Sequence, residues 1–368
     1  MSEPHVAQHR ALRLHGARDA RVESVAVPAL VPGSVRVRVE WAGICGTDLR
    51  LFAHGPADAA SHPLLSDSGP RVLGHELAGT VVELAPDVTG IPVGSAAAIR
   101  PNVWDGTCPS CRRGDTNICR HWGFVGVNGG GGGFSEYVVV PAESVHLLPA
   151  HIGTDVGALV ESTAVGWHAA KRSGVRPGDV GLVVGGGPIG LAVTMSLLAL
   201  GAATVIVSEP SARRADLARS LGAVVTDPRT DDLAEVLAMH APDGADVAFD
   251  AAGISPATFR AAYGSVRRGG RMVVVARVHD PIPFDFGDVL FTEREITGSF
   301  SYTDEDFAEA LAAIADGRID PSPLISRRIA LDDVVPQGLE LLLGEGRDSE
   351  VKILVTPSAS APLSESDH

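Results

Sequence analysis

The chain is poor in several kinds of residue, and each shortage excludes a class of protein. Of its 368 residues only 30 are Lys or Arg, against 45 Asp or Glu, so the formal net charge is -15. This balance argues against a nucleic-acid-binding protein, which needs a basic face. Aromatic residues make up only 5% of the chain, whereas Gly (42) and Pro (25) are abundant. We therefore expect a turn-rich protein of about two domains, with cores of Ala, Val and Leu.

Long hydrophobic segments are also missing. The N-terminal stretch MSEPHVAQHRALRLHGARDARVE holds no apolar run that would serve as a signal peptide. The longest apolar run, residues 189–200, is interrupted by Gly190, Thr194 and Ser196, and it is shorter than the roughly 20 residues that cross a bilayer. We therefore expect a cytoplasmic protein with no membrane partner.

Cysteine is scarce and unevenly placed, since three of the four cysteines lie close together. Cys108, Cys111 and Cys119 have the spacing C-x2-C-x7-C, and Asp105 precedes Cys108 by three residues. In a reducing compartment such a cluster indicates a metal site rather than disulfides. Three thiolates and a carboxylate would complete a closed, structural zinc site in a loop with little core of its own. The alternative is three free cysteines in a loop.

The chain changes character near residue 155. Before it, short segments that alternate or are rich in β-branched residues, such as 34–39, 78–84 and 135–140, predict a β-rich domain. After it, strands alternate with helices, which predicts a parallel doubly wound sheet and an α/β class overall. The expected strands are 180–184, 204–207, 223–226, 246–250 and 271–275, and the clearest helices are 188–200 and 212–221.

The C-terminal part completes the pattern. From about residue 300 we expect a helix at 304–316, a second helix near 331–343 and a strand at 350–355. The tail from residue 358 is small and polar, so a disordered end is predicted.

A glycine-rich turn follows the first strand of the predicted doubly wound sheet. Gly185, Gly187 and Gly190 fit G-x-G-x-x-G, and Pro188 and Ile189 open the helix that follows. In a dinucleotide site the first glycine permits the tight turn, the second admits the pyrophosphate and the third lets helix and strand pack closely. The helix N-terminus supplies N–H groups and a positive dipole. The alternative is a glycine turn without a nucleotide.

An acidic residue ends the next predicted strand. Glu209 follows Gly190 by nineteen residues, where it would accept hydrogen bonds from the adenosine ribose. A carboxylate there repels a 2′-phosphate, so NAD is favoured over NADP, although Arg213 and Arg214 nearby soften that preference.

A fourth cysteine belongs to a different set. Cys45 lies in GICGTD, the segment GHE with His75 follows, and Glu161 lies in ALVESTAV. A thiolate, an imidazole and a carboxylate suit a zinc ion whose fourth position stays open for substrate. Spacing alone does not show that they converge. Taken singly, they are also explained as a small buried residue, a core histidine and an acid at a helix N-terminus.

Together these segments resemble the zinc-containing medium-chain dehydrogenase/reductase family, over roughly residues 10 to 357. The similarity is greatest to the branch of (R,R)-butanediol dehydrogenases, next to sorbitol and threonine dehydrogenases. The segments that carry it are GICGTDL (43–49), HPL (62–64), LGHELAGTVVEL (73–84), CRRGDTNIC (111–119), GGFSEYVVVPA (132–142), ALVESTAVGWHA (158–169), GGGPIGLA (185–192), ITGSFSYTDEDFAEAL (296–311) and VKILVTP (351–357).

The resemblance implies a GroES-like catalytic domain, residues 1–155 and 301–357, and a Rossmann coenzyme domain, residues 156–300. Cys45, His75 and Glu161 would hold a catalytic zinc, with Glu76 as an outer carboxylate or alternate ligand, and Val165 would back the nicotinamide ring. The implied reaction is reversible hydride transfer between a secondary alcohol and NAD, with zinc lowering the pKa of the alcohol.

The proton path departs from the family pattern. Thr47 would take the alcohol proton, but Arg50 stands where the branch usually has a relay histidine, and a guanidinium stays protonated. We expect His54 to replace it; the alternatives are release to water, and an Arg50 that binds an anionic group. Asp105 for the usual Cys, and Ser162-Thr163 for the usual Pro-Leu, are further departures.

The substrate expected is a vicinal diol, an acyloin or a polyol, in a homodimer or homotetramer that pairs through the edge strand 295–300. Two alternatives remain: a dehydrogenase of an amino alcohol or a biosynthetic cyclitol, and a non-catalytic NAD-binding relative.

Overall fold

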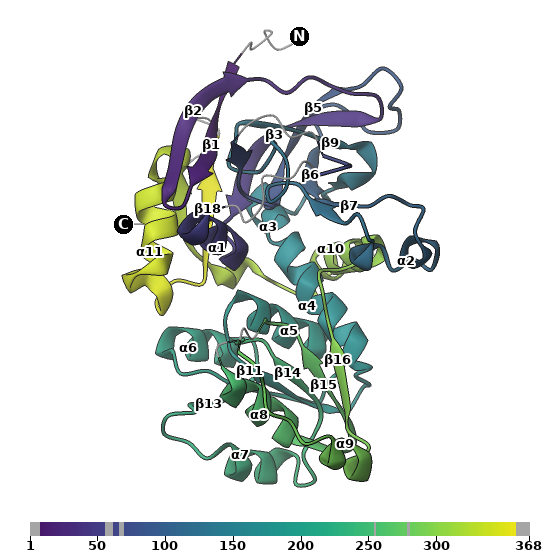
Figure 1. Cartoon of the computed structure of the whole chain (residues 1–368), viewed down its shortest axis with the longest axis vertical. Coiled ribbons are helices and arrows are strands. Elements are labelled where there is room, and N and C mark those ends of the chain that lie inside the picture. Colours follow the sequence, from purple (N-terminus) through teal and green to yellow (C-terminus); the bar gives the residue numbers. More distant parts are fainter. Residues whose placement is uncertain (1–7, 56–61, 66–69, 254, 278–279, 358–368) are drawn as a thin grey trace. The chain divides into compact units, whose positions relative to one another are not determined.

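The computed structural model describes residues 8–55, 62–65, 70–253, 255–277 and 280–357 (Figure 1). They form two compact units. The first contains the described residues up to Glu161 and those from Ile325 onward, and the second contains the residues from Ser162 to Leu324. Among the described residues, no helix is long and apolar enough to cross a membrane. The tail predicted to be disordered lies outside the described residues.

The first unit is built on a seven-stranded sheet of order β10-β6-β5-β3-β18-β17, in which β9 also pairs with β3. Along β3, buried valines alternate with half-buried arginines, because one face of the strand packs on the core. The strands of this sheet are β3 (Ser34–Gly43), β5 (Glu76–Leu84), β6 (Ala96–Ile99), β9 (Tyr137–Pro141), β10 (Val145–Leu147), β17 (Ile325–Ala330) and β18 (Lys352–Thr356).

Two smaller sheets and short helices complete this unit. The smaller sheets are β2-β1-β4, made of β1 (Gln8–Gly16), β2 (Asp19–Ala26) and β4 (Arg71–Val72), and the pair β7 (Asn102–Val103) and β8 (Gly123–Phe124). The helices are α1 (Gly46–His54), α2 (Pro109–Arg112), α3 (Thr154–Ala158) and α11 (Glu340–Leu343). Leu51 and Phe52 of α1 are buried in the same core as the strands, which fixes the helix that follows Cys45.

The single helix expected near 331–343 is wrong in detail. The structure has a 3-10 turn at Leu331–Asp333, a π-helix at Val334–Leu339 and then α11. Pro336 is the physical reason, because its ring nitrogen cannot donate the α-helical hydrogen bond and its ring crowds the preceding turn.

The second unit is a six-stranded parallel sheet of order β13-β12-β11-β14-β15-β16 with helices between successive strands. This confirms the predicted doubly wound α/β class. The strands are β11 (Val180–Val184), β12 (Thr204–Ser208), β13 (Val224–Thr226), β14 (Ala245–Asp250), β15 (Val266–Val274) and β16 (Glu295–Gly298). The helices are α4 (Val160–Ser173), α5 (Pro188–Ala199), α6 (Ala212–Ser220), α7 (Leu233–His240), α8 (Pro256–Gly264), α9 (Phe286–Thr292) and α10 (Asp304–Ala315).

The expected unit boundaries were 155/156 and 300/301. The structure instead divides the chain after Glu161 and after Leu324. Helix α10 therefore belongs to the second unit. Its Asp306 is 2.7 Å from His168 Nδ1 and 2.9 Å from Lys171 Nζ, both on α4. The buried contact with His168 and the partly exposed one with Lys171 hold α10 to the Rossmann-like unit.

Candidate metal and coenzyme sites

Asp48 brings the N-terminus of α1 and the start of β5 together. One oxygen of its buried carboxylate accepts a hydrogen bond from the Cys45 N–H at 2.9 Å, and the other accepts from the Gly74 N–H at 3.1 Å. Gly74 has φ +89°, and a Cβ there would lie 2.8 Å from the Phe134 side chain, so the turn before His75 requires glycine. Cys45 and His75 are thereby placed side by side.

Cys45, His75 and Glu76 form a cluster in which one donor atom of each lies within 4.8 Å of the others. Sulfur, nitrogen and oxygen donors in a largely buried setting fit zinc. The Glu161 carboxylate, also buried, lies outside that 4.8 Å cluster, although it is near enough to raise the pKa of Lys352. The structure thus brings together two of the three predicted ligands with Glu76, and Glu161 is not a member of that cluster.

A buried lysine holds Glu76. Lys352 Nζ donates to both carboxylate oxygens of Glu76, at 2.7 and 2.6 Å, and to the Ile44 carbonyl at 3.3 Å. Burial lowers the pKa of Lys352, but the nearby Glu76 and Cys45 raise it more, so the ammonium stays charged. The ammonium of Lys352 therefore binds both oxygens of Glu76.

Negative charge outweighs positive charge around the cluster. The anionic groups are the carboxylates of Asp48, Glu76 and Glu161 and the thiol of Cys45 when it is ionised. Lys352, and His75 when it is protonated, balance two of them at most. Burial lowers the pKa of His75, but Asp48 and Cys45 outweigh that effect and raise it well above its usual value. The site therefore attracts positive charge, as a divalent cation site should.

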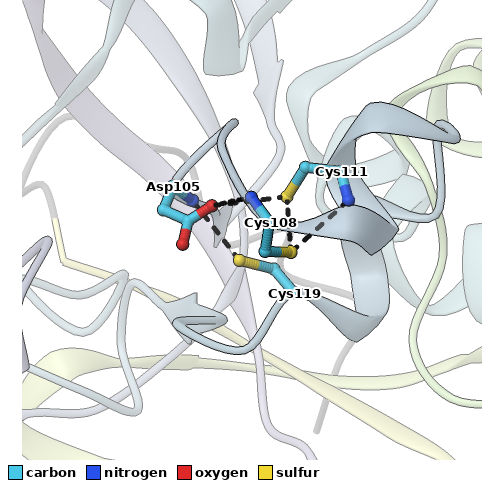
Figure 2. Close-up of side chains that lie close together, drawn as sticks. All are labelled: Asp105, Cys108, Cys111 and Cys119. Atoms are coloured by element: carbon cyan, nitrogen blue, oxygen red, sulfur yellow. Dashed lines mark hydrogen bonds between the residues drawn. The ribbon is translucent and has the colours of Figure 1, made fainter.

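The second cluster lies in the loop around α2, and Figure 2 shows its four members pointing toward one another. Asp105, Cys108, Cys111 and Cys119 each present a donor atom within 4.8 Å of the others. The Cys108 and Cys111 sulfurs are 3.5 Å apart, and Cys111 Sγ is 3.7 Å from Asp105 Oδ1. The structure therefore brings all four predicted structural ligands together.

Backbone N–H groups that follow closely in sequence donate to three of the members. Asp105 Oδ1 accepts from the N–H groups two and three residues later, at Thr107 (2.7 Å) and Cys108 (3.0 Å). Cys108 Sγ accepts from Cys111 N (3.5 Å), and Cys119 Sγ accepts from the N–H two residues later (3.3 Å). Asp105 therefore occupies a position equivalent to that of a thiolate ligand.

These N–H groups stabilise negative charge. They hold the pKa of Asp105 well below its usual range, with Thr107 contributing most. They lower the pKa of Cys108 to about 6, chiefly through Cys111 N–H. Burial and the neighbouring Cys108 and Cys119 sulfurs raise the pKa of Cys111 to about 12. Because a metal binds the thiolate form of cysteine, metal binding at this cluster would release thiol protons.

The glycine turn of the second unit fits a dinucleotide. A Cβ on Gly190 would lie 1.8 Å from the Gly185 carbonyl oxygen, so helix α5 packs closely against the turn. Gly185 has φ +98°, which favours glycine, and a Cβ on Gly187 would meet no described atom within 4 Å. Pro188 and Ile189 start α5, as predicted.

Glu209 lies beside this turn. Its carboxylate accepts from Gly186 N–H and Ser211 N–H, both at 2.7 Å, and the residue is almost completely buried at the end of β12. Arg214 lies half-buried on α6, whose Ser211 N-cap accepts from its N–H. A fixed negative charge therefore stands at the edge of the glycine turn.

Two domain models match the chain: an alcohol dehydrogenase GroES-like domain over residues 31–150 and a zinc-binding dehydrogenase domain over residues 188–316. (R,R)-butanediol dehydrogenase of Bacillus subtilis is 36% identical over 353 residues, which covers 95% of this chain and 100% of the relative. The chain belongs to the zinc-containing medium-chain dehydrogenase/reductase family.

Other members of this family are also similar to the chain over most of its length. (R,R)-butanediol dehydrogenase of Saccharomyces cerevisiae is 35% identical and covers 88% of this chain and 91% of the relative. The X-ray crystal structure of 2R,3R-butanediol dehydrogenase from Bacillus subtilis superposes with a TM-score of 0.88, over 95% of this chain and 100% of that one. As a medium-chain dehydrogenase, the protein is an oxidoreductase that acts on CH–OH groups of small molecules with zinc and a nicotinamide coenzyme.

Sequence reasoning missed several residues of this medium-chain dehydrogenase. Lys352 could have been noticed in the sequence, because it is the one charged residue in the apolar strand KILV. Arg120 and His121, which lie beside Asp105, could not have been singled out from the sequence, since exposed basic residues in a loop are common. The remaining predicted residues are placed as follows: Thr47 half-buried and His54 exposed on α1, and Val165 half-buried on α4.

Proposed function

We propose that this chain catalyses reversible hydride transfer between NAD and a secondary alcohol, with a vicinal diol or acyloin such as 2,3-butanediol or acetoin, or a polyol, as substrate. The observation that carries the proposal is the buried cluster of Cys45, His75 and Glu76. The substrate class follows from the names of the similar proteins, which include butanediol dehydrogenases, a probable diacetyl reductase and sorbitol dehydrogenases.

For the catalytic zinc we propose Cys45, His75 and Glu161 as ligands. Because Lys352 binds both oxygens of Glu76, Glu76 acts as an outer carboxylate or alternate ligand. A zinc ion held by these residues would supply a Lewis acid that lowers the pKa of an alcohol hydroxyl. Asp48 holds the N-terminus of α1 in place, and so positions Cys45.

The proton leaves by way of Thr47 and His54 in this proposal. His54 is seven residues beyond Thr47 on α1, a rise of about 10 Å along the helix, so water must bridge the two. Arg50 lies between them, and its guanidinium stays protonated. His54→Ala should therefore shift the pH–rate profile, whereas His240→Ala, which changes the last residue of α7, should not. An unchanged profile for His54→Ala would exclude it from the path.

The coenzyme is NAD rather than NADP in this proposal, because Glu209 holds a buried carboxylate beside the glycine turn where a 2′-phosphate would be repelled. Gly185, Gly187, Pro188, Ile189 and Gly190 form the pyrophosphate site, with Val165 behind the nicotinamide and Arg214 near the ribose. Glu209→Ala should raise the activity with NADP relative to NAD.

For the loop cluster we propose a structural zinc held by Asp105, Cys108, Cys111 and Cys119. All four cysteines of the chain are free. A site of three thiolates needs a reducing compartment, which supports a cytoplasmic location.

We also propose that copies of this chain pair through β16, the last strand of the parallel sheet. Large apolar side chains flank that strand and are strongly exposed; they are Phe286, Leu290 and Phe291 of α9, Ile296 of β16 and Phe300. A second copy would cover them and continue the sheet, as a dimer or within a tetramer.

The test of the proposed activity is a substrate panel. Zinc-loaded enzyme is mixed with NAD or NADP and with each stereoisomer of 2,3-butanediol, sorbitol, glycerol, threonine and simple secondary alcohols, and reduced coenzyme is followed by absorbance. We expect a diol or polyol with NAD to give the highest kcat/KM. Cys45→Ser should abolish turnover and lose the catalytic zinc while the fold is retained. Turnover by Cys45→Ser, or activity confined to threonine, would contradict the proposal.

A further inference from the structure

The carboxylate that stands in the loop cluster has two oxygens, and the structure uses them differently. Oδ1 of Asp105 faces the sulfurs and takes the two backbone N–H groups (Figure 2). Oδ2 accepts from Arg120 Nε at 3.1 Å and lies 3.0 Å from His121 Nδ1. Arg120 is held in turn by its Nη2, which donates to Thr107 Oγ1 at 3.3 Å. The side chain of Asp105 is 8% exposed.

The two oxygens have different partners because a carboxylate ligand differs from a thiolate ligand. A thiolate offers one atom, and backbone N–H groups are enough to satisfy it, as at Cys108 and Cys119. A carboxylate in the same place leaves a second charged oxygen that is almost buried and needs donors of its own. Arg120 and His121 follow the ligand Cys119 directly in sequence, so the same turn delivers both of them to Oδ2.

We propose that Arg120 and His121 are positioning residues of this metal site. By binding Oδ2 they leave Oδ1 for the metal, and they allow a carboxylate to take the place of a thiolate. Charge supports this role, because three thiolates and one carboxylate around a divalent zinc carry an excess of two negative charges, and Arg120 offsets one of them. The inference rests on the structural zinc proposed above.

The competing explanation is an ordinary surface ion pair. The Arg120 side chain is 61% exposed, and exposed pairs contribute little to stability. Such a pair would leave metal binding unchanged. Groups that orient a ligand instead change metal affinity about 10- to 100-fold when they are removed. Because of the exposure of Arg120 we expect the lower end of that range.

The experiment measures zinc in the loop cluster alone. In the full chain carrying Cys45→Ser, zinc content is determined by mass spectrometry, and zinc transfer to a chromophoric chelator is timed. Arg120→Ala should speed the transfer about tenfold. His121→Ala should speed it as well. The matched control is Arg113→Ala, because the Arg113 side chain pairs with Asp115 in the same loop and is also 61% exposed. Its contact with the proposed ligand Cys111 is made by the backbone N–H, which the substitution keeps. It should leave the rate unchanged.

A second pair of variants tests whether Arg120 matters because Asp105 has a second oxygen. Asp105→Cys removes the second oxygen, so adding Arg120→Ala to it should not change the transfer rate. The inference would be overturned if Arg120→Ala sped zinc transfer equally in the Asp105 chain and in the Asp105→Cys chain. It would also be overturned if zinc left the Arg120→Ala chain no faster than the Arg113→Ala chain. A Cys45→Ser chain that holds no zinc at all would instead overturn the structural zinc site itself.

Discussion

Lys352 places an ammonium group where water does not reach. The residue is 1% exposed, and Glu76, its partner, is fully buried. Removing two charges from water costs several kcal/mol for each, and the attraction between them repays this only when the geometry is good. Two short hydrogen bonds to Glu76 and one to the Ile44 carbonyl satisfy that condition. The pair thus fixes the Glu76 carboxylate beside Cys45 and His75.

Lys352→Met should therefore cost about 3–5 kcal/mol of unfolding free energy, because it leaves Glu76 buried and without its counter-charge. The measurement is urea unfolding of the zinc-loaded chain. Adding Glu76→Gln to Lys352→Met should restore part of the loss, since the uncompensated charge disappears. If the double variant is no more stable than Lys352→Met, the cost lies in packing and this account of the pair is wrong.

Asp306 connects two helices of the second unit. Burial raises the pKa of its carboxyl, but hydrogen bonds from His168, Lys171 and Thr303 outweigh it and hold the pKa well below the usual range. A carboxylate of this kind stabilises the fold above the unfolded-state pKa of about 4, and the contribution is lost as the pH falls through the folded pKa. The contact of α10 with α4 should therefore weaken in acid.

Asp306→Asn should lower the unfolding free energy by about 2 kcal/mol near neutral pH. The difference from the wild type should shrink as the pH drops below about 4, because the carboxyl of the unfolded wild-type chain then binds a proton while the folded one stays ionised to lower pH. The measurement is denaturant unfolding over a series of pH values. Asp316→Asn is the control, because Asp316 forms an exposed pair with Arg318 and should change stability by less than about 1 kcal/mol. A pH-independent difference for Asp306→Asn would contradict the prediction.

At the scale of elements, the sequence predicted the second unit better than the first. Strand β11 and the start of α5 fall where the pattern placed them, because parallel strands are continuous apolar runs and Pro188 marks the helix start. The irregular turns at 331–339 did not follow from periodicity, since Pro336 interrupts an otherwise helical pattern. The boundary near 324 was missed because the contacts of Asp306 join residues far apart in sequence.

At the candidate site, too, contacts between residues far apart in sequence could not be predicted. The sequence could predict most members of the two clusters, because Cys, His and acidic residues at metal spacings are rare. The groups that surround them were not, because Lys352 reaches Glu76 across 276 residues and only the folded sheet brings them together. Arg120 and His121 acquire a role only because Asp105 has a second oxygen. Sequence patterns therefore point to candidate donor residues, and the fold determines which other groups surround them.

At the scale of the whole molecule, the exposed apolar side chains around β16 have the strongest consequence. Phe286, Leu290 and Phe291 are 76, 72 and 74% exposed, and they lie on one short helix beside the edge strand of the parallel sheet. Contiguous apolar surface at an edge strand is costly unless another chain covers it. A second copy is the proposed cover, because it presents the same strand and the same side chains around a two-fold axis.

Leu290→Glu should weaken this pairing by roughly 3 kcal/mol, or about a hundredfold in dissociation constant, because it buries an unpaired charge in the interface. Light scattering after size exclusion, over a range of protein concentrations, measures the mass. Met239→Glu is the matched control, since Met239 is also 72% exposed but lies on α7. It should keep the wild-type mass. If the wild-type chain is monomeric at every concentration, no surface joins the copies. If Leu290→Glu associates as strongly as Met239→Glu, another surface joins them.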